Sequence, residues 1–202
     1  MDFVQRFYPL NLVSGFIAVS ILAIPREYLK GWLALVLGDD TPKKAGRLSF
    51  NPLVHLDPIG TAAFIIFDFG WTRPIPLRPW KLGKKRLLIV AISGPILNIV
   101  EAVVFAILAR DAVHETFIFD VLYKSAKYSF TYAMFSLFPV PPLDGSKILE
   151  ALLPEKYTSW IVKYEVYGVL FLLALLVLWI LPLMMSPFVK MIDTFMEVMV
   201  GV

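Results

Sequence analysis

Long apolar stretches dominate this chain, and short polar segments separate them. The first stretch covers about residues 10–37 and ends at Gly38, and further stretches cover residues 87–109, 117–138 and 164–183. About 20 apolar residues are enough to cross the hydrocarbon core of a bilayer. Each stretch is therefore predicted to be a membrane helix, the third being less purely apolar than the others.

Shorter elements are predicted between the long stretches. Residues 47–50 and 72–77 are expected to be short strands, and residues 61–69 form an apolar helix too short to span a bilayer. Residues 144–153 are expected to be another short helix. Apolar positions recur at helical spacing in residues 188–200, which indicates an amphipathic helix that either lies at the membrane interface or packs its apolar face on the bundle.

Composition supports a membrane protein. Of the 202 residues, 58% are hydrophobic and 17% are charged, and the mean hydropathy is +0.74, whereas soluble domains are about half apolar and a quarter charged. The predicted fold class is an all-α polytopic membrane protein with about four to six membrane helices and a small β element near the membrane face. Residues 1–202 are expected to form a single domain.

Charge distribution predicts the orientation. The basic residues between the first and second long stretches are Lys43, Lys44, Arg47, Arg73, Arg78, Lys81, Lys84, Lys85 and Arg86. Such clustering is typical of the cytoplasmic side of membrane proteins, so the net charge of +3 does not indicate a nucleic-acid partner. The absence of cysteine excludes disulfides and thiolate metal sites. The first six residues lack the features of a removable signal peptide.

Three ionisable residues interrupt the first apolar stretch. Arg26, Glu27 and Lys30 lie where the pattern predicts the interior of a membrane helix. A charged side chain that faces lipid without a partner costs several kcal/mol. These side chains are therefore expected to be paired, to reach water or to serve a function.

Three motifs occur in a fixed order along the chain. They are residues 38–61, which include Asn-Pro-Leu-Val-His-Leu-Asp-Pro, then Gly-Pro-Ile-Leu-Asn at 94–98, and Phe-Pro-Val-Pro-Pro-Leu-Asp-Gly at 138–145. In order and spacing they resemble the site-2 protease family of intramembrane zinc metalloproteases, in its short form without a PDZ domain. The resemblance extends from about residue 10 to residue 180.

The resemblance implies a metal site that this chain has altered. In the family, a His-Glu-x-x-His motif supplies two zinc ligands on one helix face and a general base, and the Asp of a Leu-Asp-Gly motif is the third ligand. Here Glu27 matches the base and Asp144 the third ligand, but Arg26 and Lys30 stand at the histidine positions. Arginine stays protonated in proteins and lysine binds metal only after losing its proton. The expected cofactor is therefore none, and Glu27 is expected to be catalytically inactive.

Charge balance suggests what replaces the metal. Arg26 and Lys30 together supply two positive charges, as zinc would, against the two negative charges of Glu27 and Asp144. We hypothesise that the four groups form a buried ion network, since buried ions are tolerated when paired. The alternative is that both cations extend to the membrane surface and leave Glu27 alone in a wet cavity.

Other family-motif residues are candidate binding residues. Ser136 stands where the family has an Asn that holds substrate, and His55 is expected beside the site. A metal site from His55, Asp57 and Asp144 is a further alternative. Asn98 is expected to hydrogen-bond between helices, with a role in function as the alternative.

Two further predictions concern the edge of the predicted strand at residues 47–50 and the buried carboxylate of Glu101. The segment Arg47, Leu48, Ser49 and Phe50 is expected to pair with an extended peptide by edge addition. Glu101, one turn after Asn98, should face the bundle interior and have a partner that the sequence does not identify.

The sequence thus favours a catalytically inactive, site-2-protease-like membrane protein that binds or regulates a membrane partner. Its expected partners are the lipid bilayer and a transmembrane protein or peptide client, and the former active site is expected to face the cytoplasm. One alternative is an active intramembrane zinc metalloprotease with an atypical metal site. Another is a transport or scaffold role that uses the polar cavity.

Overall fold

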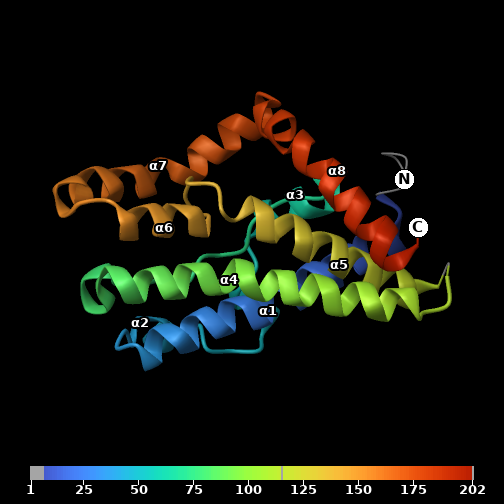
Figure 1. Ribbon diagram of the computed structural model, residues 1–202, viewed down its shortest axis with the longest axis horizontal. Coiled ribbons are helices and arrows are strands. Elements are labelled where there is room, and N and C mark those ends of the chain that lie inside the picture. Colours follow the sequence, from blue (N-terminus) through green and yellow to red (C-terminus); the bar gives the residue numbers. More distant parts are fainter. Residues whose placement is uncertain (1–6, 115, 202) are drawn as a thin grey trace.

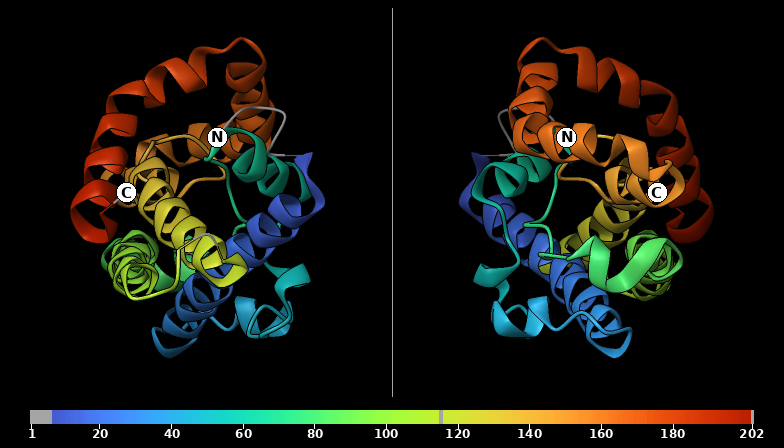
Figure 2. Two further views of the ribbon diagram at one scale, coloured as in Figure 1. Left: turned by 90° about the vertical axis from the view of Figure 1, so that its right-hand side faces the viewer. Right: turned by 90° about the vertical axis from the view of Figure 1, so that its left-hand side faces the viewer.

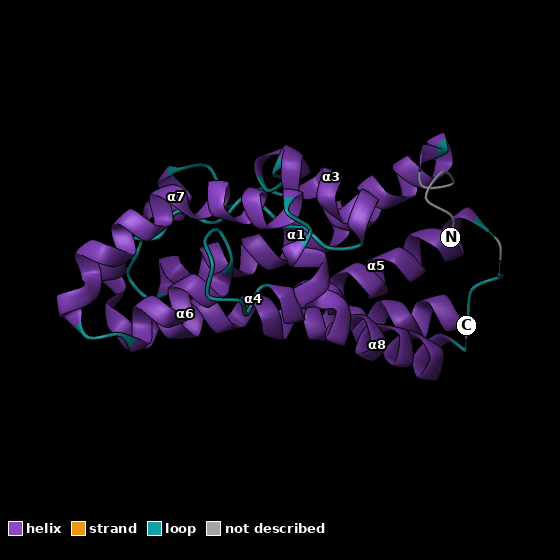
Figure 3. Cartoon of the chain, turned by 90° about the horizontal axis from the view of Figure 1, so that it is seen from above, coloured by secondary structure: helices purple, strands orange, loops and turns teal. Residues whose placement is uncertain are grey.

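Helices and connecting loops make up the computed structural model, which describes residues 7–114 and 116–201 (Figure 3). The long helices are α1 (Pro9–Val36), α4 (Pro79–Arg110), α5 (Phe117–Phe135), α7 (Thr158–Val177) and α8 (Ile180–Val200). The short helices are α2 (Thr41–Lys44), η2 (Pro52–Val54), α3 (Pro58–Phe67), α6 (Asp144–Leu152) and η3 (Glu155–Tyr157). The all-helical class predicted from the sequence is confirmed for the described residues.

Three long helices form the centre of the fold. Helix α4 packs against α1, α5 and α6, and α1 packs against α5 (Figure 1). Helices α7 and α8 arch over one side of this bundle, and the end of α8 returns to α4 and α5 (Figure 2). The main core contains Leu22, Phe64, Trp71 and Phe135, all fully buried.

Helices α1 and α4 could each span a membrane. They have 28 and 32 residues, and within the described part of the chain they are the helices that are both long and apolar enough to cross a bilayer. The sequence predicted both, although α4 begins at Pro79 rather than near residue 87. Proline is well suited to the first turn of a helix, and Gly83, at φ 69° and ψ 166°, kinks the helix soon afterwards.

Neither predicted strand is present in the described residues. Residues 47–50 are irregular, and residues 72–77 contribute only an isolated antiparallel bridge between Leu56 and Thr72. Two prolines at 74 and 76 remove donors from the second segment. In addition, the guanidinium of Arg47 donates to the carbonyls of Arg73 (2.6 Å) and Pro74 (3.0 Å), so a side chain takes the place of a neighbouring strand.

The predicted membrane helix over residues 164–183 divides into two helices. Helix α7 ends at Val177, Trp179 adopts a left-handed conformation with φ 60°, and α8 begins at Ile180. Pro182 has no amide hydrogen to donate to the carbonyl of Leu178, so an uninterrupted helix would lose a hydrogen bond there.

The amphipathic segment at residues 188–200 is the later part of α8. Its side chains Ile192, Met196 and Val200 are buried in a cluster with Ala106 of α4 and Ala126 of α5. Of the two alternatives open from the sequence, packing of the apolar face on the bundle is therefore the one that the structure shows.

Candidate functional site

One turn of α1 carries three charged side chains into the interior of the bundle. Arg26, Glu27 and Lys30 are 1%, 0% and 4% exposed. They face α4, α5 and the start of α6 rather than the protein surface. The alternative in which both cations extend to the membrane surface is therefore wrong, because burial this deep leaves them no path to water.

Asp144, the first residue of α6, holds both cations. Its Oδ1 lies 2.5 Å from Nζ of Lys30, and its Oδ2 accepts a hydrogen bond from Nη2 of Arg26. The backbone positions this carboxylate: the amide of Gly145 donates to the carbonyl of Ser136 at 2.8 Å. The start of α6 is thereby tied to the end of α5 and to the middle of α1.

Glu27 completes the predicted ion network. Its Oε1 accepts from Nη1 of Arg26 at 3.1 Å and from the hydroxyl of Thr72 at 2.7 Å, and its Oε2 lies 3.6 Å from Nζ of Lys30. Because the Thr72 hydroxyl donates its one hydrogen to Glu27, it accepts a hydrogen bond from the Tyr132 hydroxyl at 2.9 Å. The network predicted from charge balance is confirmed in its four members.

Arg26 has further partners on its other side. Its Nε donates to Oδ1 of Asn98 at 2.7 Å, and its guanidinium carbon lies 4.0 Å from the centre of the Tyr132 ring. The amide nitrogen of Asn98 donates to Oε2 of Glu101 at 2.7 Å. The structure thus supplies the partner for Glu101 that the sequence left open, and it confirms Asn98 as a hydrogen-bonding bridge between α1 and α4.

Gly94 permits this close approach of helices. A Cβ atom at this position would lie 2.8 Å from Oδ2 of Asp144, 3.1 Å from Nη2 of Arg26 and 3.1 Å from Cδ of Lys30. Any side chain there would displace the network, so a glycine is required on this face of α4.

The donor set does not fit a zinc ion. Zinc is bound by thiolates, neutral imidazoles and carboxylates, whereas the groups that surround Asp144 here are a guanidinium and an ammonium, which offer no lone pair. With two positive and two negative groups, the four-residue network is already neutral. Among the described residues no group of three or more His, Asp or Glu could hold a metal ion, and this includes the alternative set of His55, Asp57 and Asp144.

His55 has a structural partner instead. It is fully buried, and its Nε2 lies 2.7 Å from the carbonyl oxygen of Ser49, so this nitrogen carries the proton. Its own carbonyl accepts from the amide of Arg73 at 2.8 Å. His55 therefore fastens the loop that contains Ser49 to the segment after α3. Asp57 caps α3 by accepting from the amide of Gly60 at 2.8 Å.

The candidate peptide-binding segment lies against the same turn of α1. Phe50 is 73% exposed and stacks on Tyr28 with ring centres 4.8 Å apart. Leu48 is half-buried, and its Cδ2 would lie 2.9 Å from a Cβ at Gly31. Because Arg47 is buried and bound to carbonyls, this segment presents apolar side chains rather than a free strand edge.

Two residues of the site were not predicted from the sequence. A third residue, which was predicted to bind substrate, has a different environment from the one expected. Thr72 hydrogen-bonds Glu27, and the ring of Tyr132 packs on the guanidinium of Arg26. Neither residue belongs to a motif or interrupts an apolar stretch. Ser136 is fully buried, and its hydroxyl donates to the carbonyl of Ala133 at 3.2 Å. Its side chain is therefore occupied by its own helix rather than directed to the network.

Comparison with known proteins gives one informative relative. The Bacillus subtilis (strain 168) protein named "Putative zinc metalloprotease YwhC" is 33% identical to this chain over 183 residues, which cover 85% of this chain and 84% of that protein. No family model matches the chain. No solved structure matches it.

Proposed function

The chain belongs to the site-2-protease-like family of metalloproteases, and from this premise we propose that it is a non-catalytic member that binds or regulates a membrane partner. It corresponds to the short form without a PDZ domain, and residues 1–202 form a single membrane domain. No zinc takes part in its function.

One observation supports this proposal above the others. The cations of Arg26 and Lys30 both bind Asp144 and both lie against Glu27 in the bundle interior. A general base needs a water molecule and an electrophile to act on. Glu27 instead neutralises two cations and accepts from Thr72, so its oxygens are used in holding helices together.

The same observation argues against proteolysis with an atypical metal site. A shifted site would need three ligands from other residues, and His55 and Asp57 are both engaged in structural hydrogen bonds. The two cations beside Asp144, those of Arg26 and Lys30, would also repel a divalent cation. We therefore place zinc outside the function of this chain.

A transmembrane segment is the partner that best suits the surface beside the network. Phe50 and Leu53 are 73% and 68% exposed, close to the turn of α1 that carries Glu27. Apolar side chains at this position contact another apolar helix or lipid at little cost in desolvation. The backbone there does not form a strand, so we propose side-chain contact rather than edge addition.

The proposed topology is multi-pass, with four to six membrane helices. Helices α1 and α4 cross the bilayer, and the basic residues between them lie on the cytoplasmic side, as positive charges of short loops generally do. The former active site then faces the cytoplasm. The bilayer itself is the first partner, in keeping with the exposed apolar side chains along α4 such as Ile96 and Val100.

A cleavage assay tests the non-catalytic assignment. The purified chain is reconstituted in liposomes with transmembrane substrates, alongside Glu27→Gln. We expect no cleavage product from either protein. Cleavage by the natural chain that Glu27→Gln abolishes would overturn the proposal and favour an active protease with an atypical metal site.

Site-specific cross-linking tests the partner surface. A photoreactive residue at position 50 is compared with one at Val113, which is 75% exposed in the loop that follows α4. With a co-reconstituted transmembrane peptide, we expect cross-links from position 50 at several times the yield from position 113. Equal yields would contradict a specific surface beside the network.

A further inference from the structure

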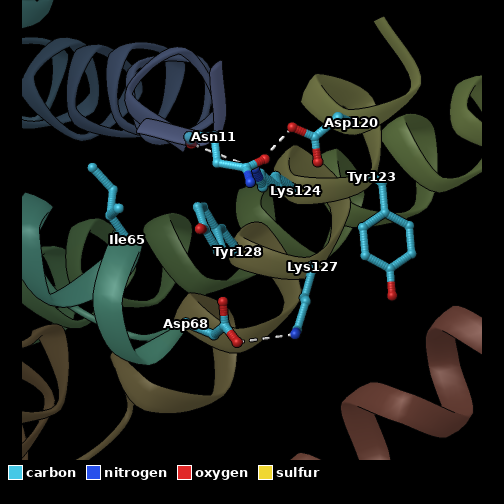
Figure 4. A pocket seen from close by; sticks show the side chains of 8 residues that line it. All are labelled: Asn11, Ile65, Asp68, Asp120, Tyr123, Lys124, Lys127 and Tyr128. Carbon is cyan, nitrogen blue, oxygen red and sulfur yellow. Dashed lines mark hydrogen bonds and ion pairs between the residues drawn. The ribbon is translucent and has the colours of Figure 1, made fainter. Parts of the chain in front are cut away.

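A polar cavity lies between α1, α3 and α5 (Figure 4). Its volume is about 160 Å³. The residues that line it are Asn11, Ile65, Asp68, Asp120, Tyr123, Lys124, Lys127 and Tyr128. Along α1, Asn11 is about 22 Å from Arg26 at 1.5 Å per residue, so the cavity is separate from the ion network.

One side of the cavity is held rigidly. Lys124 donates to Asp120 at 2.8 Å, to Ser14 at 2.7 Å and to the side chain of Asn11 at 3.2 Å. Three N–H groups are all that a lysine ammonium has, so Lys124 is saturated. Asp120 uses Oδ2 for both Lys124 and Ser14. Its Oδ1 accepts from no described residue, and the side chain lines the cavity (Figure 4).

The opposite side of the cavity is adjustable. Nζ of Lys127 lies 3.1 Å from Oδ2 of Asp68, and both side chains are 25% exposed. An ion pair this exposed contributes at most about 1 kcal/mol, so a ligand can share or replace it. Lys127 has further N–H groups to offer, since this is the one acceptor that its ammonium has among the described residues.

The backbone conformation of Asp68 is a further feature of this side of the cavity. Asp68 ends α3 in the left-handed region, with φ 63°. Non-glycine residues seldom adopt this conformation, and such residues concentrate at ligand sites. The carboxylate of this residue pairs with Lys127 on α5.

The charges of the lining determine which ligand fits. Among the described residues that line the cavity, two carboxylates and two ammonium groups sum to zero. A ligand of one sign therefore gains little from them, whereas a ligand that carries both signs meets a partner for each. We propose that this cavity binds the phosphoethanolamine head group of a membrane lipid. The proposal rests on the membrane topology proposed above.

The position of the cavity along the membrane normal supports a membrane lipid as the source of the head group. Helix α1 has 28 residues and is therefore about 42 Å long, close to the 40–45 Å of a bilayer with its head groups. Because the basic loop residues follow the C-terminal end of α1, Asn11 at its N-terminal end lies at the head-group level of the opposite leaflet.

Each end of the head group has a defined partner. The phosphate accepts from the remaining N–H groups of Lys127, and the primary ammonium donates to Oδ1 of Asp120. A choline head group carries no N–H and cannot make the second bond. A glycerol head group supplies no positive charge for Asp120. The cavity volume of about 160 Å³ corresponds to only about five water molecules, each of which takes up about 30 Å³ of the liquid. An acyl chain does not fit in this volume, so the acyl chains of the lipid remain in the bilayer.

Lipid binding to the full chain tests the proposal. Detergent-solubilised protein is titrated with phosphatidylethanolamine, phosphatidylcholine and phosphatidylglycerol of identical acyl chains, and retention is measured by native mass spectrometry. We expect at least tenfold tighter binding of phosphatidylethanolamine than of either other lipid. Similar affinity for all three lipids would overturn the proposal.

Variants locate the binding to the cavity. Lys127→Met should weaken the binding of all three lipids about threefold or more, because it removes the charge-assisted hydrogen bond to the phosphate that they share, and Lys127→Arg should retain the binding. The matched control Lys43→Met removes an exposed lysine of α2, beyond the other end of α1, and should leave the binding unchanged. Binding of phosphatidylethanolamine that is unchanged in folded Lys127→Met protein, or that Lys43→Met weakens equally, would contradict this site.

A soluble probe separates the head group from the lipid. Glycerophosphoethanolamine should compete with phosphatidylethanolamine in the natural chain. Binding of this soluble compound without retention of the lipid would support the head-group chemistry and overturn the lipid as its source. None of these results depends on cleavage or on metal content, so failure here leaves the non-catalytic assignment standing.

Discussion

The ammonium of Lys30, in the middle of α1, lies 2.5 Å from Oδ1 of Asp144 at the first position of α6. The two residues are 114 positions apart in the sequence. Family resemblance assigns them to a histidine and an aspartate that would meet at a zinc ion. Here they meet directly, and the contact that the metal would provide between two helices is made by an ion pair.

Removing the shared carboxylate should destabilise the fold. Asp144→Asn leaves Arg26 and Lys30 with one carboxylate between them in a buried site, and the loss of one member of a buried ion pair costs about 3–5 kcal/mol. Thermal unfolding in detergent should show a clearly lower midpoint. The control Asp193→Asn changes an exposed residue of α8 and should unfold like the natural chain. A midpoint for Asp144→Asn equal to that of the control would contradict a structural role for the network.

Glu27 and Glu101 should respond differently to the same substitution. Glu27→Gln removes the partner of two cations, so stability should fall. Glu101 forms no ion pair among the described residues, its Oε1 is buried without a hydrogen bond, and its Oε2 accepts only from Asn98. A neutral amide can accept the same bond, so Glu101→Gln should be neutral or stabilising. Equal destabilisation in chemical unfolding experiments would show that Glu101 carries a charge that the network needs.

Adding one methyl group next to the network should disturb it. Gly94→Ala places Cβ 2.8 Å from Oδ2 of Asp144, and such overpacking costs about 1–3 kcal/mol. Gly15→Ala is the comparison, because its nearest neighbour is Cγ1 of Ile65 at 3.2 Å, a side-chain atom that can move. The unfolding midpoint should fall more for Gly94→Ala than for Gly15→Ala. The reverse order would mean that the network tolerates displacement.

Restoring the two histidines should restore metal binding. Arg26→His combined with Lys30→His places two imidazoles four residues apart on one helix face, opposite the carboxylate of Asp144, and these are the ligand types that zinc uses. We expect close to one zinc per chain in this double variant, measured by elemental mass spectrometry, and a large loss when Asp144→Asn is added. A double variant that folds but takes up no zinc would contradict the correspondence between this site and the family metal site.

Acid stability should depend on a surface cluster near the end of α1. Hydrogen bonds from Lys44 and then Lys81, both at 2.5 Å, hold the pKa of the Asp40 carboxyl well below its usual range. Because the pKa is lower in the folded state, this stabilisation is fully present above the ordinary aspartate pKa and is lost as the pH falls through the lowered one. Asp40→Asn should therefore lose less stability than the natural chain between about pH 5 and pH 2. Parallel curves for the two proteins would show that the cluster does not contribute.

The sequence predicted the ion network because burial of charge in an apolar helix leaves few alternatives. Arg26, Glu27 and Lys30 had to find partners, and the motif that contains Asp144 provided one of opposite sign. Thr72 and Tyr132 could not be predicted in the same way. Each is an ordinary residue of its segment, and its place beside Glu27 follows from how that segment packs.

Errors in the predicted elements have a similar cause. The pattern of residues 47–50 and 72–77 favours strands, but pairing depends on which groups reach the backbone, and the side chain of Arg47 reaches those carbonyls first. Residues 164–183 were predicted to form one helix because they are almost continuously hydrophobic. The break at Trp179 is a backbone event, and only Pro182 signals it in the sequence.

In this chain an ion network stands in place of the metal. The zinc content of the purified protein is the most direct test of that. The natural chain is purified without chelators, equilibrated with zinc at neutral pH, desalted and analysed by elemental mass spectrometry. We expect zinc well below one ion per ten chains. Close to one zinc per chain, lost in Asp144→Asn, would contradict it.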